Sequence, residues 1–114
     1  NGDIGQWNTE KVANMSGMFD SASSFDQDLR DWNIGSITTM DNMFDNSGMS
    51  EESIHPTLVY WAVFVQDNDG PDNITCGMEG VVACNTPAIF EAIEYLEATR
   101  GWTLEGLTMN NECQ

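Results

Sequence analysis

Apolar residues follow the same order twice in the first half of the chain. Displacing the sequence by 25 positions aligns seven identical residues. The identical pairs are Asp3/Asp28, Trp7/Trp32, Asn8/Asn33, Met15/Met40, Met18/Met43, Phe19/Phe44 and Asp20/Asp45. Ile4 also aligns with Leu29, and Val12 with Ile37. A repeat of this length is typical of solenoids, in which stacked copies of one short unit bury aligned apolar residues in continuous columns.

Each repeat divides into two pieces. In residues 3–7 and 28–32 the apolar residues are separated by polar ones or glycine, which we interpret as one short strand per repeat. The Met-x-x-Met-Phe pieces that follow predict a helical turn or an irregular arc. Asn8 and Asn33 are either plain turn-forming residues or members of a stacked ladder that pairs backbone groups at a corner, and their recurrence favours the ladder.

The second half begins with a helical pattern. Ser50 suits the N-cap, and acidic residues follow it in the first turn. The expected buried face comprises Ile54, Leu58, Trp61, Ala62 and Val65. Pro56 predicts that the helix kinks or begins near it, because proline lacks an N–H group. Tyr60 and Phe64 lie off this face and are expected to contact something else.

A second helix is predicted after Thr86, which suits the N-cap, with Pro87 at the first helical position and Gly101 just past the end. Its apolar stripe comprises Ile89, Phe90, Ile93 and Leu96. Residues 102–104 then predict a short strand. We therefore expect one domain, residues 1–114, with two repeats in 1–49 and a C-terminal cap with two helices in 50–114.

The segment WNTEKVANMSGMFDSASSFDQDLRDWN resembles the short repeat of BspA-like and mycoplasma-type surface proteins. Asp26 stands where that pattern has Asn, and Ser47 where it has Ala. The pieces MSEESIHPTLVYWA and RGWTL resemble the C-terminal end of such proteins. The resemblance implies an α/β fold, a leucine-rich-repeat-like solenoid, and extracellular display with adhesion or partner binding.

The charge of the chain excludes several kinds of partner. It has 19 Asp and Glu against 3 Lys and Arg, giving a formal net charge of −16. Nucleic acids and anionic membranes both require basic surfaces, so neither is an expected partner. A protein or glycan partner would be basic or bridged by divalent cations. No apolar run approaches the roughly 18 residues that a membrane-spanning helix needs.

The three cysteines give two possibilities. Cys76 and Cys84 enclose a short glycine-containing stretch, so they either form a disulfide or remain buried free thiols. If they pair, Cys113 is left over and would have its partner in another chain or in a missing segment. No His lies near them in the sequence, which disfavours a zinc site.

Candidate ligating and catalytic residues are few. Asp67, Asp69 and Asp72 invite comparison with a calcium loop, but the EF-hand spacing fails, and a solvated acidic turn is preferred. His55 is the only histidine, and its place beside Pro56 suggests a surface or junction residue. No nucleophile motif or phosphate-binding loop occurs, so we expect neither catalysis, nor a metal, nor a cofactor.

Two glycosylation sequons occur, at Asn14 and Asn73. Asn73 lies in a predicted surface loop and is the better candidate. A glycan on Asn14, within the first repeat, would have to point outward.

These observations favour an extracellular or surface-displayed module for protein or glycan binding or adhesion. The alternative is a small structural subunit of a larger assembly in an extracytoplasmic space or an organelle lumen. Because Asn1 starts inside a repeat, we expect further repeats or another chain to cover the N-terminal edge.

Overall fold

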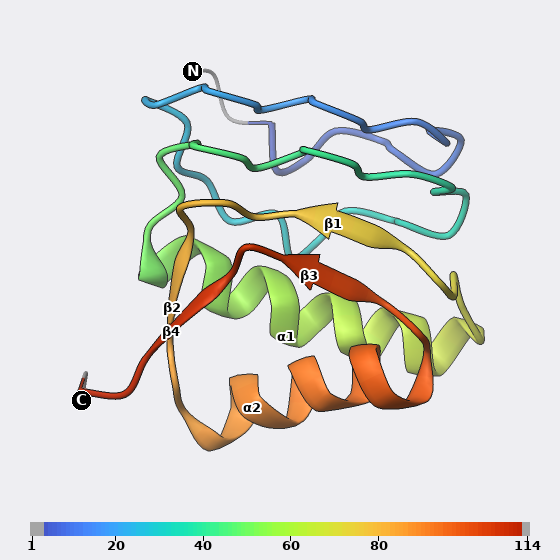
Figure 1. Cartoon of the computed structure of the whole chain (residues 1–114). Helices are drawn as coiled ribbons and strands as arrows, with labels where there is room; N and C mark the ends of the chain where they lie inside the picture. The colour runs from blue at the N-terminus through green and yellow to red at the C-terminus, as the bar shows by residue number, and fades with distance from the viewer. Residues whose placement is uncertain (1–3, 113–114) are drawn as a thin grey trace.

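A computed structural model describes residues 4–112 (Figure 1). The chain is an α/β protein, as the resemblance implied. Its elements are α1 (Glu51–Asn68), β1 (Thr75–Gly77), β2 (Val82–Cys84), α2 (Pro87–Glu94), the π-helix η1 (Tyr95–Thr99), β3 (Thr103–Glu105) and β4 (Thr108–Asn110).

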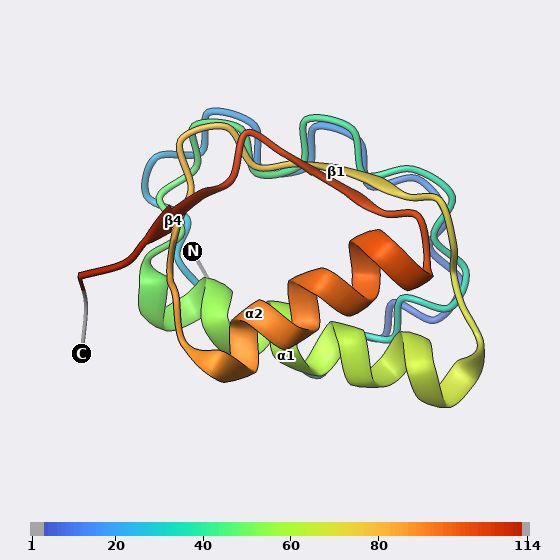
Figure 2. The same ribbon diagram turned by 60° about the horizontal axis from the view of Figure 1, so that its bottom comes forward.

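The strands form two small parallel sheets. β1 pairs with β3, with Cys76 opposite Leu104, and β2 pairs with β4, with Ala83 opposite Met109. The two helices contact each other and lie on the same side of the strands (Figure 2). The core fills the space between the helices and the rest of the chain.

The predicted solenoid is wrong. The four strands belong to two separate two-stranded sheets, and residues 4–50 contain only isolated bridges, Asn14 with Thr39 and Met40 with Cys76. A solenoid with one strand in each repeat would instead place its first two strands in this part of the chain. The two helices predicted for residues 50–114 are present.

Turns replace the strands predicted in the repeats. In both pieces the backbone N–H of the tryptophan donates to the carbonyl three residues earlier, Trp7 to Ile4 and Trp32 to Leu29, each at 3.1 Å. Asp3, the first residue of the earlier piece, lies outside the described residues. Further along the repeats, Gly17, Ser21, Asn42 and Asn46 have φ between 58° and 65°. Extended backbone cannot continue through such residues, so the repeats follow a path of turns.

The two repeats nevertheless lie side by side, and Figure 2 shows their traces almost superposed. The N–H groups of Met15 and Phe19 donate to the carbonyls of Thr39 and Met43, at 3.0 and 2.9 Å. The second repeat contacts the strand region in turn, since the Phe44 N–H donates to the Gly77 carbonyl at 2.8 Å.

Asn8 and Asn33 have a turn-forming role. Each side-chain Oδ1 accepts from the N–H two residues later, Glu10 at 3.1 Å and Gly35 at 2.9 Å. Each asparagine thus pairs a backbone group of its own turn, which is the simpler of the two sequence interpretations.

Most of the aligned apolar residues lie in one core. Met15, Met40, Met43 and Phe44 are buried, and Phe44 lies between the rings of Phe19 and Trp61 at centroid distances of 5.8 and 6.3 Å. The predicted face of α1 is also buried, as Ile54, Leu58, Trp61, Ala62 and Val65.

Helix α1 begins as predicted at Ser50, whose hydroxyl accepts from the Ser53 N–H at 3.3 Å. Pro56 lies inside the helix, so of the two alternatives predicted for it, a helix that begins near Pro56 is wrong. Pro56 cannot donate to the Glu52 carbonyl four residues earlier, and Glu52 is exposed, so water can pair with that carbonyl.

Helix α2 also begins as predicted. The Thr86 hydroxyl accepts from the Ile89 N–H at 3.3 Å, Pro87 is the first helical residue, and Gly101 has φ of +73° after η1. Ile89 is buried as expected, but Phe90 is 54% exposed, contrary to the predicted stripe.

Candidate functional site

The first repeat exposes apolar side chains whose counterparts in the second repeat are buried. Trp7 is 53% exposed, whereas its counterpart Trp32 is 1% exposed. Met18 is 39% exposed, whereas its counterpart Met43 is 0% exposed. The same residue types therefore occupy matched positions, and what differs is whether another part of the described chain covers them.

Unpaired carbonyl groups lie along the same side. In the second repeat, the carbonyls of Asp41, Met43 and Asp45 accept from N–H groups of the first repeat at 2.7–2.9 Å. The carbonyls aligned with them belong to Ser16, Met18 and Asp20, which are all exposed residues. Within residues 4–112 no group donates to these three carbonyls. We call Trp7 and residues 14–20, on the side away from the second repeat, the first-repeat edge.

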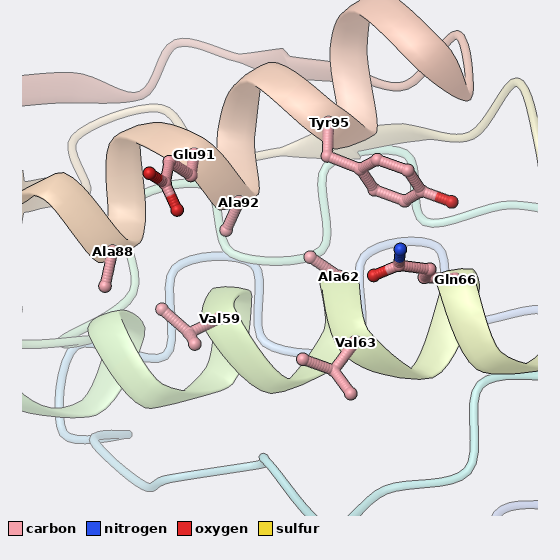
Figure 3. A pocket seen from close by; sticks show the side chains of 8 residues that line it. All are labelled: Val59, Ala62, Val63, Gln66, Ala88, Glu91, Ala92 and Tyr95. Atoms are coloured by element: carbon pink, nitrogen blue, oxygen red, sulfur yellow. The ribbon is translucent and has the colours of Figure 1, made fainter.

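A groove of about 330 Å³ lies between exposed parts of the two helices (Figure 3). It is lined by Val59, Ala62, Val63, Gln66, Ala88, Glu91, Ala92 and Tyr95. Figure 3 shows Tyr95 and Gln66 approaching each other at one end of the groove. Small alanine side chains leave the hollow, and its lining favours apolar contact rather than chemistry at a nucleophile.

An ion-pair cluster closes the loop that follows α1. Arg100 contacts Asp69 at 2.8 Å and Asp72 at 3.2 Å, and its Nε donates to the Tyr95 hydroxyl at 2.8 Å. The hydrogen bond with Tyr95, followed by the one with Asp69, raises the pKa of Arg100 above its usual value. Asp67 remains in α1. Two of the three residues considered for calcium thus hold a guanidinium group.

Across residues 4–112 no group of three or more His, Cys, Asp or Glu side chains is arranged to hold an ion. His55 lies half-buried in the first turns of α1.

Of the two possibilities for Cys76 and Cys84, a bond between them does not occur. Cys76 is a free, buried thiol, whereas Cys84 is disulfide-bonded. Cys76 lies in β1 opposite Leu104 and is fully buried, so its side chain belongs to the core. Burial, with a further contribution from the negative charge of Asp45, raises the pKa of the Cys76 thiol. Cys113 lies outside the described residues.

Both sequon asparagines are exposed. Asn14 lies on the first-repeat edge, where its Oδ1 accepts from the Ser16 N–H at 2.9 Å. Asn73 has φ of +61° in the loop before β1. Their glycosylation stays a prediction, and the structure leaves both amides on the surface.

Sequence reasoning anticipated an uncovered first repeat but assigned Trp7 and Met18 to the core. It also missed that Phe90 faces outward. The sequence did contain a signal for this exposure. Glu94 and Glu97 follow Phe90 by four and seven residues, so they lie on the same face of the helix.

The fold and its surfaces define a small α/β protein with two turn-rich repeats packed on a pair of helices. Residues 1–63 match the family described as "Mycoplasma protein of unknown function, DUF285". The chain belongs to this family. The match fits a mycoplasma-type repeat but does not single out the BspA-like proteins.

Comparison with curated proteins gave no match, and comparison with solved structures gave none either. In the part of the chain from 4 to 112, no helix has both the length and the apolar character needed to cross a membrane.

Proposed function

We propose that the protein is a non-catalytic, surface-displayed module that binds another polypeptide through the first-repeat edge. The observation that carries the proposal is the contrast in exposure between Trp7 and Trp32 and between Met18 and Met43. Exposed large apolar side chains grouped with open backbone acceptors are typical of interaction surfaces. Membership in a family with mycoplasma-type repeats supports an extracellular location.

The hydrogen-bonding pattern defines what the partner must supply. Ser16, Met18 and Asp20 present carbonyls at alternate positions, so the partner needs backbone N–H groups at a matching spacing. Within the chain, the N–H groups of Gly17 and Phe19 donate to carbonyls of the second repeat, and the partner's N–H groups would donate with the same spacing. Two copies of the chain cannot join symmetrically through these groups, because both would present acceptors.

A structural subunit of a larger assembly is the second candidate, since buried apolar contact at Trp7 and Met18 also suits a permanent neighbour. The two candidates differ in their response to salt. A displayed module of charge −16 that recognises a basic partner should lose affinity as salt rises. A permanent subunit should stay bound in fixed ratio.

A tethered segment tests the proposal directly. The donor segment has the sequence of residues 6–24 with phenylalanine at the position of Trp7, and a flexible linker joins it to the N-terminus. Tethering raises its effective concentration to the millimolar range, so weak pairing becomes measurable. We expect the donor segment to raise the urea midpoint of unfolding.

The matched control blocks two of the donors, the N–H groups that would pair with the Ser16 and Met18 carbonyls. In the methylated segment, sarcosine replaces Gly17 and N-methylphenylalanine replaces Phe19, which leaves the side chains in place. We expect no rise in the midpoint with this segment. Within the protein itself, Met18→Ser should abolish the gain, and Val82→Ser, at an exposed apolar site on β2, should leave it intact. Equal midpoints for the donor and methylated segments would show that the edge does not pair with N–H groups.

A further inference from the structure

A second groove lies on a different face of α2 from the groove of Figure 3. It has a volume of about 460 Å³ and is bordered by α2, η1 and the end of β4. Its lining comprises Asn85, Phe90, Ile93, Glu94, Glu97, Met109 and Asn111. We call it the Phe90 groove.

The floor of the Phe90 groove is apolar. Phe90 is 54% exposed, more than any other large apolar residue described. Ile93 and Met109 are half-buried and pack against the core. An aromatic ring left in water beside two further apolar side chains provides a surface that gains free energy when another apolar group covers it.

The charge beside this floor is entirely negative. Glu94 and Glu97 contribute carboxylates, and the lining contains no Lys or Arg. Two of the three basic residues of the chain are engaged elsewhere, Arg30 with Asp28 and Arg100 with Asp69 and Asp72. The third, Lys11, lies in the first repeat.

Amide groups at the rim suit a peptide backbone. Asn85 and Asn111 line the groove and hydrogen-bond to each other through their side chains. An asparagine side chain has more donors and acceptors than this one bond uses, so the pair can also meet the N–H and C=O groups of a bound chain.

We propose that the Phe90 groove binds a segment of a partner polypeptide in which an apolar side chain lies next to Lys or Arg. The apolar side chain packs on Phe90, Ile93 and Met109. The cation contacts the Glu94 and Glu97 carboxylates and the face of the Phe90 ring. Charge complementarity with a chain of −16 selects a basic segment over an acidic or neutral one. This site is independent of the first-repeat edge.

The test uses a fluorescein-labelled peptide that alternates leucine with lysine, and fluorescence anisotropy measures its affinity for the whole protein. We expect Phe90→Ser to weaken binding by about tenfold, as for loss of an aromatic contact at an interface. The double variant Glu94→Gln/Glu97→Gln should weaken binding by a similar factor and flatten its dependence on salt. Glu91→Gln, in the groove of Figure 3, is the control and should bind as the wild type does.

Two further probes separate the apolar contribution from charge alone. A peptide with serine in place of leucine and the polyamine spermine should both bind at least tenfold more weakly than the leucine–lysine peptide. Equal binding of either probe, or unchanged binding by Phe90→Ser, would overturn the proposal. If Phe90→Ser does not fold, the double glutamate variant decides by itself, since both residues are exposed.

Discussion

At the scale of single residues, Thr57 shows how one buried hydroxyl joins the repeats to α1. Its Oγ1 accepts from the Leu29 N–H at 3.0 Å and donates to the Ser53 carbonyl at 2.8 Å. Thr57 and Leu29 are both fully buried, so the Leu29 N–H cannot turn to water if the hydroxyl is lost. Nothing in the sequence distinguished it from other threonines.

Thr57→Val should therefore lower the free energy of unfolding by about 1–3 kcal/mol, because it leaves the Leu29 N–H buried without a partner. Thr57→Ser keeps the hydroxyl and loses one methyl group, so it should cost about 1 kcal/mol. Urea unfolding measures both. A valine variant as stable as the wild type would mean that this hydrogen bond contributes nothing.

Asp26 adds a pH-dependent contact at the start of α1. Burial favours the neutral acid, but hydrogen bonds from Ser53 and Ser50 outweigh it and lower the pKa of Asp26 below its usual value. The backbone N–H and the hydroxyl of Ser50 both donate to Asp26 Oδ1 at 2.9 Å. The carboxylate therefore stabilises the fold above the pKa of the unfolded chain, near 4. This contribution is lost as pH falls through the lower pKa of the folded state.

Asp26→Asn keeps an acceptor oxygen and removes the charge, and it restores the residue of the resembling repeat pattern. We expect the variant to be less stable than the wild type at pH 7, with the difference shrinking towards pH 3. Urea midpoints at the two pH values measure this. A difference that stays constant would show that ionisation of Asp26 is not involved.

At the scale of elements, local signals predicted the helices well. The caps at Ser50 and Thr86, and Gly101 after η1, depend on residues close in sequence. The strands of the repeats were predicted wrongly, because Leu29 and Trp32 are three positions apart, a spacing that fits a turn. The left-handed backbone at Ser21, a residue type that carries no strong preference for it, could not be inferred from sequence.

The cysteines show the same limit, because spacing along the chain does not reveal which thiol is buried. The structure predicts that iodoacetamide labels Cys76 only after unfolding, while Cys84 appears in a linked peptide when the protein is digested without reduction. Mass spectrometry of the digest reads out both. The digest must cleave after Glu79, between the two cysteines, and a linked peptide that then contains Cys76 would contradict the packing of β1.

At the scale of the whole molecule, the two proposed binding surfaces lie far apart. Figure 1 shows the first repeat and α2 on opposite sides of the strands. The first-repeat edge offers backbone acceptors and exposed apolar groups, whereas the Phe90 groove offers carboxylates around an apolar floor. One partner could therefore occupy each surface without competition. The sequence analysis already expected a partner at the N-terminal edge, whereas the groove depends on where the end of β4 lies relative to α2.

The exposure of Trp7 provides the most direct measurement of the central claim. Trp7 is 53% exposed, whereas Trp32, Trp61 and Trp102 are at most 2% exposed, so acrylamide should quench Trp7 almost alone. We predict that Trp7→Phe removes most of the quenching, and that the tethered donor segment lowers the quenching of the wild type while the methylated segment does not. Equal quenching with and without the donor segment, or equal protection by both segments, would contradict the account.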